Sequence, residues 1–342
     1  MGMNAVSTGD LQVAIAKGWK PNQYLSNMSM AYFADRTDFF ARKIMPICPV
    51  KLSTSYYYEF SRADLARDNV SRKPKGGTVA PAVIGHTDSM YKCDVYQIRY
   101  PIDQIGTLDF QRSNAPGAID PRRNRVRVIT EQMDIHLDRA FSEAFMQPGV
   151  WRHEFAGVDS TPSGNQFLKF SDANFDPVHF FDEQKKEMKR MGRREPNKLS
   201  LGYDAYLALK SHPDILERVK YSGSTPNPAT VNEKVLAELF GLSEVTYLAS
   251  TYNAAAEGQA EDMQFIADSK GALLTYTTPS PQIDEPSAGY IFTWDMLGNG
   301  QYIAIDQYEG EKGTHTEFVE GLMAYDMKKT SDELAMYFKD CV

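Results

Sequence analysis

The segment from Ser61 to Asp88 is the feature that most limits how this chain folds. It reads SRADLARDNVSRKPKGGTVAPAVIGHTD, has few apolar residues, and lies between two strand-like segments. Connections in compact domains are usually about 2–6 residues long, and a loop beyond about 12–15 residues is functional or disordered. Its basic residues are Arg62, Arg67, Arg72, Lys73 and Lys75. We therefore expect an arm that leaves the core and reaches another protein chain; a loop without a partner is the alternative.

The segments on either side of this arm have the alternation of half-buried strands. Before it, apolar residues occupy alternate positions: Leu52, Tyr56, Tyr58 and Phe60. After it, a return strand runs from Met90 to Tyr100, with Tyr96 and Ile98 on the same parity. This period of two predicts one long hairpin over residues 51–100, whose tip is Lys73-Pro74-Lys75-Gly76-Gly77.

The strongest helix is predicted over residues 120–147. Asp120 is a good N-cap, Pro121 suits the first helical position, and Pro148-Gly149 ends the pattern. Between them, apolar residues recur at steps of three or four: Val126, Ile129, Met133, Leu137, Phe141 and Phe145. A helix of this length is about 40 Å long at 1.5 Å per residue, which indicates a structural spine that crosses more than one layer.

Four arginines lie in the opening turns of this helix: Arg122, Arg123, Arg125 and Arg127. Cations at a helix N-terminus oppose the macrodipole by about 0.3–1 kcal/mol each when they are exposed. Either these side chains form a solvated basic face, or an acidic partner compensates them.

The rest of the chain mixes helices and strands without a regular βαβ alternation, which predicts the α+β class. A second helix begins at Asp176-Pro177 and ends at Gly192, and Thr230-x-x-Glu233 forms a capping box for another. A strand leads into a helix in NKLSLGYDAYLAL, and a short helix is expected around Tyr32–Arg42. Strand-like runs follow in the last third: EVTYLAS, MQFIADS, ALLTYTT, GYIFTW, YIAIDQY and TEFVEGLMAYDM.

Composition and motifs give no sign of an enzyme. The 342 residues allow two lobes, and 42% hydrophobic with 24% charged residues is an ordinary globular composition. The three cysteines are far apart, which argues against a disulfide framework, and the six histidines have no metal-ligand spacing. Phosphate-binding loops and nucleophile elbows are absent from the sequence, as is an apolar run long enough for a membrane. We expect no catalytic site, cofactor or metal, and the net charge of −8 disfavours general nucleic-acid binding.

The stretch PNKLSLGYDAYLALKSHPDILERVKYS resembles a segment shared by tailed-phage major capsid proteins. There an Asn-led strand enters a helix, and "HPD" begins a second helix that ends in a Lys-Tyr pair. The matching residues are Pro196, Asn197, Leu209, His212, Pro213, Asp214, Lys220 and Tyr221. Flanking blocks agree in order, among them DPRRNRVRVITEQMDIHLDRAF, PSAGYIFTW and AYDMKKTSDELAMYFKDCV. Two departures, Phe170 for Trp and Met191-Gly192 for Thr-Gly, keep the aromatic ring and the glycine.

The resemblance implies the capsid fold named after phage Hong Kong 97. Its N-terminal arm would be residues 1–50, its extended E-loop hairpin 51–100, and its peripheral domain, with the spine helix, 101–195. The axial domain would be 196–315, and C-terminal strands 316–342 would return to the peripheral domain. Contacts between subunits are then expected from the basic residues of the arm, from Tyr56 and Tyr58, and from the four spine arginines.

The resemblance also implies function and partners. The chain would be the structural subunit of an icosahedral phage head, self-assembling as hexamers and pentamers around double-stranded DNA that it does not bind sequence-specifically. It would be made in the host bacterial cytoplasm and end in the virion, with a separate scaffolding protein, a portal at one vertex and room for a decoration protein. The alternatives are an encapsulin-like nanocompartment shell, a tail-tube or connector subunit, and an α+β enzyme.

Overall fold

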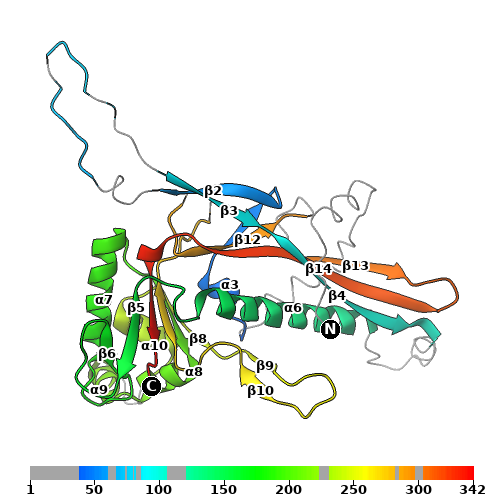
Figure 1. Cartoon of the computed structure of the whole chain (residues 1–342). Helices are drawn as coiled ribbons and strands as arrows, with labels where there is room; N and C mark the ends of the chain where they lie inside the picture. The colour runs from blue at the N-terminus through cyan, green and yellow to red at the C-terminus, as the bar shows by residue number, and fades with distance from the viewer. Residues whose placement is uncertain are drawn as a thin grey trace.

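The computed structural model describes residues 38–60, 67–73, 75–79, 81, 86–105, 121–222, 231–281, 285–296 and 303–342. This part of the chain forms an elongated body built on two sheets, from which a two-stranded ribbon projects (Figure 1). The elements are α3 (Ala41–Ile44), β1 (Ile47–Val50), β2 (Thr54–Phe60), β3 (His86–Lys92), β4 (Asp94–Asp103), α6 (Pro121–Phe145), β5 (Glu154–Val158), β6 (Gln166–Leu168), α7 (Pro177–Gly192), β7 (Lys198–Gly202), α8 (Tyr203–Ser211), α9 (Pro213–Ser222), α10 (Glu233–Phe240), β8 (Glu244–Leu248), β9 (Thr251–Asn253), β10 (Met263–Phe265), β11 (Ala272–Thr275), β12 (Gly289–Trp294), β13 (Ile303–Glu309), β14 (Thr316–Lys329), the 3₁₀ turn Asp332–Leu334 and β15 (Ala335–Lys339). The predicted mixture of helices and strands is confirmed.

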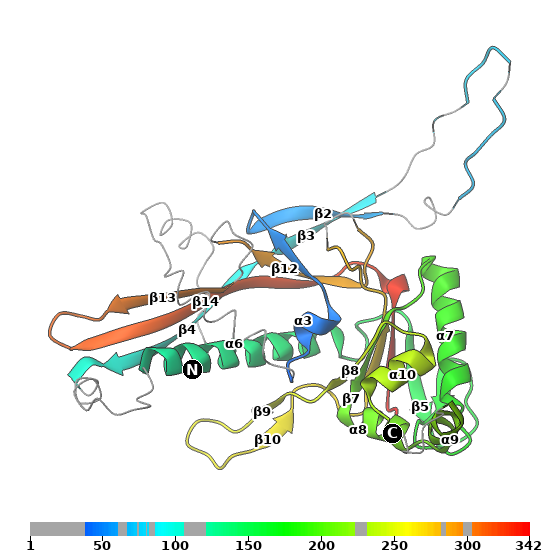
Figure 2. The same ribbon diagram turned by 180° about the vertical axis from the view of Figure 1, so that it is seen from behind.

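The first sheet has five strands and is built around β14. One edge of β14 pairs antiparallel with β12 and then with β13, while its other edge pairs antiparallel with β4. Strand β1 extends the sheet by pairing parallel with β12. Helix α6 lies along one face of this sheet in both ribbon views and contacts β14 and β4 (Figures 1 and 2).

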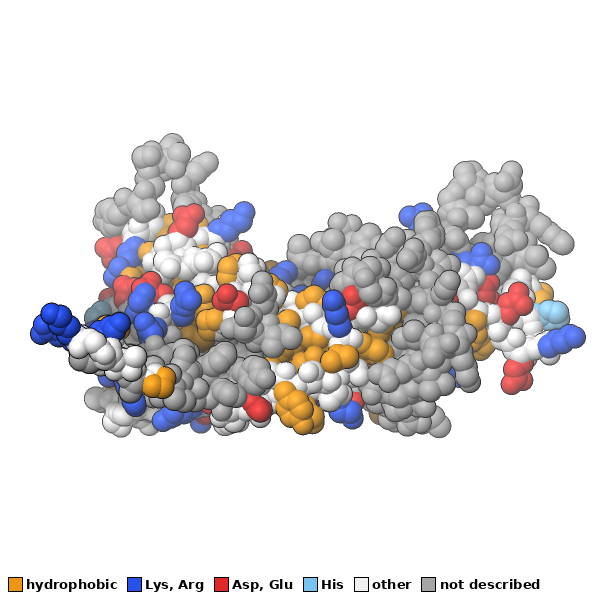
Figure 3. Space-filling model, turned by 90° about the horizontal axis from the view of Figure 1, so that it is seen from above, with side chains coloured by type: hydrophobic (Ala, Val, Ile, Leu, Met, Phe, Trp, Pro, Cys, Tyr) orange, Lys and Arg blue, Asp and Glu red, His pale blue; other side chains and the backbone are white. Residues whose placement is uncertain are grey.

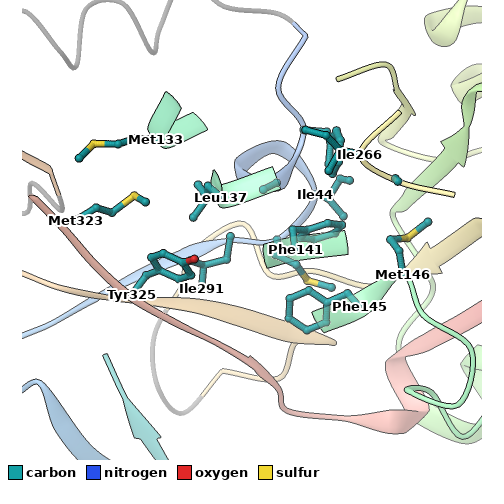
Figure 4. Close-up of a cluster of buried hydrophobic side chains, with 14 of the residues drawn as sticks. Ile44, Met133, Leu137, Phe141, Phe145, Met146, Ile266, Ile291, Met323 and Tyr325 are labelled. Carbon is teal, nitrogen blue, oxygen red and sulfur yellow. The ribbon is translucent and has the colours of Figure 1, made fainter. Parts of the chain in front are cut away.

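The spine helix agrees with its prediction to within two residues at each end, since α6 runs from Pro121 to Phe145. All six residues of the predicted apolar stripe are at most 4% exposed. Figure 4 shows part of this stripe packed with Ile44 of α3 and Tyr325 of β14. Gly321 of β14 lies beneath the helix, where a Cβ atom would be 2.5 Å from a methyl carbon of Ile129. Glycine at this position therefore allows the helix to approach the sheet closely.

The second sheet has six strands in the order β6-β5-β15-β11-β7-β8. It mixes parallel and antiparallel pairs, and helices α7, α8, α9 and α10 gather around it (Figure 2). Its core is rich in phenylalanine, including Phe170, Phe181, Phe240 and Phe338, each at most 1% exposed. The rings of Phe181 in α7 and Phe240 in α10 lie 4.6 Å apart, which joins the two helices.

The ends of α7 and α10 can be compared with the predicted caps. Asp176 caps α7 as expected, since its carboxylate accepts the N–H groups of Val178 and His179 at 3.1 Å each. At the other end α7 stops at Gly192 as predicted, and Arg193 after it is left-handed. Leu334 and the Glu333 backbone leave no space for a Cβ at position 192, which explains the glycine. Helix α10 is capped by Asn232, whose side chain accepts from the N–H of Val235.

The predicted single return strand from Met90 to Tyr100 is wrong. The chain forms two strands that are separated at Cys93, and they belong to different sheets: β3 pairs with β2, and β4 pairs with β14. The predicted buried parity is also wrong. Tyr56 is 65% exposed, whereas Tyr57 is 4% exposed. Alternation alone does not say which face meets the body, and here the apolar residues of the opposite parity are the buried ones.

The five-stranded and the six-stranded sheet each contain strands from more than one predicted domain. The domain boundaries themselves remain predictions. Strand β15, expected to return to the peripheral domain, lies inside the six-stranded sheet, and so do β5 and β6. Other expectations lie outside the described residues: most of the arm over 1–50, most of the helix around Tyr32–Arg42, and the cap at Thr230. Among the described residues, no helix is long and apolar enough to cross a membrane.

Candidate interaction surfaces

The β2–β3 ribbon is attached to the body through one face. Tyr57 of β2 and Tyr91 of β3 are almost fully buried, and their rings lie 5.4 Å and 4.7 Å from the ring of Phe292 in β12. Cys93 and Val95, both fully buried, continue this cluster into β4. An isolated two-stranded ribbon is marginally stable in water. The aromatic contact with Phe292 therefore fixes the root of the ribbon on the five-stranded sheet.

The opposite face of the ribbon carries an exposed apolar pair. Tyr56 and Met90 are direct cross-strand partners and are 65% and 50% exposed. Leu52, two residues before β2, is 63% exposed. Cross-strand neighbours act as one surface because their Cβ atoms are about 4.5–5.5 Å apart. Tyr56 and Met90 thus form one apolar surface; together with the exposed Leu52, four residues before Tyr56, we call them the outer ribbon patch.

The predicted basic residues lie at the far end of this ribbon, where they are described. Arg67, Arg72, Lys73 and Lys75 are all exposed. The described part of this arm extends away from the body in Figure 1, and Lys and Arg side chains lie at the corresponding left edge of Figure 3. Arg62 and the side chain of Tyr58 lie outside what the structure describes. Four of the five basic arm residues therefore lie exposed on the projecting part of the chain.

The spine arginines divide into two pairs. Arg122 forms a bidentate ion pair with Glu317 of β14, at 2.9 Å and 2.8 Å, and the Glu317 side chain is only 7% exposed. Arg125 lies over the ring of Tyr100, 5.6 Å from its centre. Arg123 and Arg127 are exposed. The acidic compensation expected at this helix end is thus supplied to Arg122 within the same chain, and Arg123 and Arg127 face solvent.

The reactive side chains of the described part have structural environments. Burial raises the pKa of the Cys48 thiol to about 11 and of the Cys93 thiol to about 12, the opposite of what a nucleophilic cysteine needs. His136 of α6 is hydrogen-bonded to the hydroxyl of Tyr325 at 2.9 Å and contacts the ring of Tyr96. Within the described ranges, no group of three His, Cys, Asp or Glu side chains is arranged to hold a metal ion.

An open groove lies at the outer end of the five-stranded sheet. It has a volume of about 560 Å³ and is lined by strands β4, β13 and β14. Its aromatic wall is the stacked pair Tyr308 and Phe318, over which Arg99 lies 5.3 Å from the Phe318 ring centre. The Arg99 guanidinium is the cation of this groove, and it is held against the aromatic wall. The groove lacks the enclosed, converging acid and base groups that define an active site.

Met90 is the surface residue that sequence reasoning missed. It was placed on the return strand but not among the contact residues, because its pairing partner was unknown. The register of β2 and β3 places it opposite Tyr56. The sequence contained a signal, because Tyr56 and Met90 each precede a tyrosine that a half-buried strand could turn towards the body. Only the position of Phe292 decides which of the two adjacent parities is buried.

Comparison with known proteins places the chain near phage capsid proteins. The chain matches no protein-family model. In sequence it is similar to the major capsid protein of Burkholderia phage BcepMu, with 24% identity over 279 residues, which cover 78% of this chain and 81% of that protein. In fold it is similar to a phage-related protein from Bordetella bronchiseptica RB50, with a TM-score of 0.70, 17% identity, and coverage of 94% of this chain and 97% of that one.

A second solved structure agrees. The capsid of the Cyanophage P-SCSP1u matches with a TM-score of 0.53 and 11% identity, over 86% of this chain and 85% of that chain. The predicted resemblance to phage major capsid proteins is therefore confirmed in sequence and in fold. A relationship to capsid proteins also agrees with the prediction that the chain is not an enzyme.

Proposed function

We propose that this chain is the structural subunit of an icosahedral phage head, assembling as hexamers and pentamers into a shell around packaged double-stranded DNA. The observation that carries the proposal is the sequence similarity to the BcepMu major capsid protein along most of both chains. The fold similarity to phage-related and phage capsid structures agrees with it.

The proposal includes the Hong Kong 97 type of fold with the domains given above. Three features support it: a spine helix with one buried stripe, a projecting ribbon in the place of the E-loop, and a second sheet wrapped by short helices in the place of the axial domain. The ribbon then corresponds to residues 54–92, since β4 belongs to the five-stranded sheet.

In this proposal the ribbon acts as a clamp between subunits. Its outer patch of Tyr56, Met90 and Leu52 is the apolar surface that a neighbour would cover, and its basic tip would meet acidic groups there. Arg123 and Arg127 are further candidate contacts, together with Arg62 and Tyr58, whereas Arg122 and Arg125 are engaged within the chain. Rings and shells need such head-to-tail contacts between different surfaces of identical subunits. Because the arm adds a second contact with the same neighbour, the two weak contacts together bind more tightly than either does alone.

The proposed partners follow from this role. A separate scaffolding protein would guide assembly in the host cytoplasm, a portal would occupy one vertex, and a decoration protein is a further candidate partner. The net charge of −8 suits a wall around DNA, because like charge lets the duplex move during packaging, whereas a strongly basic wall would hold it.

The first experiment is negative-stain electron microscopy of the chain expressed alone and together with its candidate scaffolding protein. Closed icosahedral particles, or patches of hexamers and pentamers, are expected. A monodisperse monomer or small oligomer under both conditions contradicts the shell proposal. Closed particles that enclose a cargo enzyme instead of DNA in the infected cell would point to a nanocompartment.

The second experiment separates the clamp from the shell proposal. The triple variant R72E/K73E/K75E is expected to fold like the wild type, because all three side chains are exposed, but to assemble at least tenfold less efficiently. The matched control is K186E/K234E/K270E, which makes the same change in net charge at exposed positions away from the ribbon. Equal particle yields from both variants would remove the clamp and leave the shell proposal intact.

A further inference from the structure

A buried carboxyl group joins the spine helix to the first described residues of the chain. Asp138 lies on α6, is 1% exposed, and faces the start of α3. Its Oδ1 accepts the N–H of Ala41 at 2.9 Å, and the N–H of Phe40 lies 3.2 Å from both Oδ1 and Oδ2. Its Oδ2 lies 2.6 Å from the hydroxyl oxygen of Ser250, just after β8. One side chain of α6 therefore contacts two other segments that are distant in sequence.

If Asp138 is ionised, the site has too few hydrogens to turn each of its short contacts into a hydrogen bond. The Ser250 hydroxyl oxygen lies 2.6 Å from Asp138 Oδ2 and 2.8 Å from the carbonyl oxygen of Asp38. A hydroxyl group has one proton to donate, and a carbonyl oxygen has none. With Asp138 ionised, only one of these two short contacts is a hydrogen bond, and the other places two acceptors against each other.

A proton on Asp138 supplies the hydrogen that is missing from these contacts. Oδ2–H then donates to the Ser250 hydroxyl, and the hydroxyl donates to the Asp38 carbonyl. Oδ1 still accepts the N–H of Ala41 and shares the N–H of Phe40 with Oδ2. We propose that Asp138 holds a proton in the folded chain at mildly acidic pH and that this proton latches the segment from Asp38 to Ala41 onto the spine helix. The inference does not depend on the proposed shell function.

The burial of the site acts in the same direction. Burial raises the pKa of Asp138 from 3.8 to about 6, against the opposing effects of its hydrogen bonds and of Arg42. A raised pKa means that the folded chain binds the proton more tightly than the opened one. The latch is therefore strongest below about pH 4, weakens as the pH rises from about 4 to 6, and stays weak above that.

The charged groups around Asp138 do not replace this proton. Arg42 of α3 lies 3.5 Å from Asp134, the carboxylate one turn earlier on α6, and so is shared between the two acids. Arg139, the next residue of α6, is directed to the surface, where it pairs with Glu143 and lies over Tyr252 of β9.

His136, on the same helix, titrates with the opposite sign. Burial lowers its pKa below the usual 6.5, so protonation of His136 on acidification destabilises the fold, whereas protonation of Asp138 stabilises it. The direction of a pH effect therefore tells the two groups apart.

Hydrogen exchange of the full chain, followed by mass spectrometry from pH 4 to 7, tests the latch. The reporters are the amides of Ile44 and Met45, which donate to the carbonyls of Phe40 and Ala41. After correction for the intrinsic pH dependence of exchange, their protection is expected to fall on the order of 100-fold between pH 4 and 7, as the shift in pKa requires. Amides of α7 serve as the internal reference and should not follow this curve.

Two variants assign the effect. In D138N the amide presents the same acceptor and a permanent donor, so protection should be high and independent of pH. In H136Q the fall with rising pH should remain as in the wild type. Protection that does not change with pH in the wild type, or that changes equally in wild type and D138N, overturns the proposal. If D138N does not fold, the wild-type curve still decides, because titration of His136 would make protection rise with pH instead of fall.

Discussion

The spine helix and the ribbon both place aromatic and aliphatic residues at regular spacing, but they use them differently. Helix α6 buries its whole stripe against β14 and β4, and every member is at most 4% exposed. The ribbon buries Tyr57 and Tyr91 at its root and leaves Tyr56 and Met90 in solvent. Helix α6 thus uses its apolar surface within its own fold. The ribbon keeps apolar surface for a contact that a single chain does not make.

The largest effect is expected at the spine. Ile129→Asp places a charge at a site that is 0% exposed and against Gly321, and an unpaired buried charge costs several kcal/mol. We expect the variant to fail to fold, as measured by circular dichroism and solubility. The matched control is Arg127→Asp, an exposed position on the same helix, which should change the free energy of unfolding by less than about 0.5 kcal/mol. A soluble, native-like Ile129→Asp protein would show that the buried face of α6 is wrongly assigned.

The next effect is expected at the root of the ribbon. Tyr91→Ala removes the ring that stacks on Phe292 at 4.7 Å, and loss of a buried aromatic ring costs about 3–5 kcal/mol when the site does not collapse. Hydrogen exchange in β2 and β3 should accelerate much more than in the six-stranded sheet. Met90→Ala, one residue away on the outer face, should leave both rates unchanged. Equal acceleration in both sheets would mean that the ribbon is not a separately anchored unit.

The difference between these regions also explains what the sequence could predict. The limits of α6 and all six buried residues followed from spacing, because a helix with a single apolar stripe has one way to bury it. A strand has two faces, so the parity of β2 depended on Phe292, which lies more than two hundred residues away in the chain. The break at Cys93 had the same cause, since β4 leaves the ribbon to pair with β14.

The candidate contacts divide in the same way. The basic tip was recognisable because a long charged arm with few apolar residues has no place in a core. The ion pair between Arg122 and Glu317 was not, because it joins residues that come together only when β14 packs beside α6. Asp138 was missed for a similar reason: a single acid within a helical pattern gives no sign that Ser250 and the start of α3 surround it.

The smallest effect on stability is expected at the outer ribbon patch, where the effect on assembly should be large. The double variant Tyr56→Ser/Met90→Ser changes two cross-strand partners that are at least half exposed, so the free energy of unfolding should shift by less than about 0.5 kcal/mol. If a neighbouring subunit covers this patch, particle yield should fall at least tenfold, because each contact is repeated around the shell. Leu207→Ser/Leu216→Ser, at two other exposed leucines, is the control for general loss of surface hydrophobicity. Electron microscopy gives the yield and chemical denaturation the stability of both variants. Normal yield from the ribbon variant would mean that Tyr56 and Met90 remain in solvent in the assembled particle, and that the ribbon holds its neighbour through the basic tip alone.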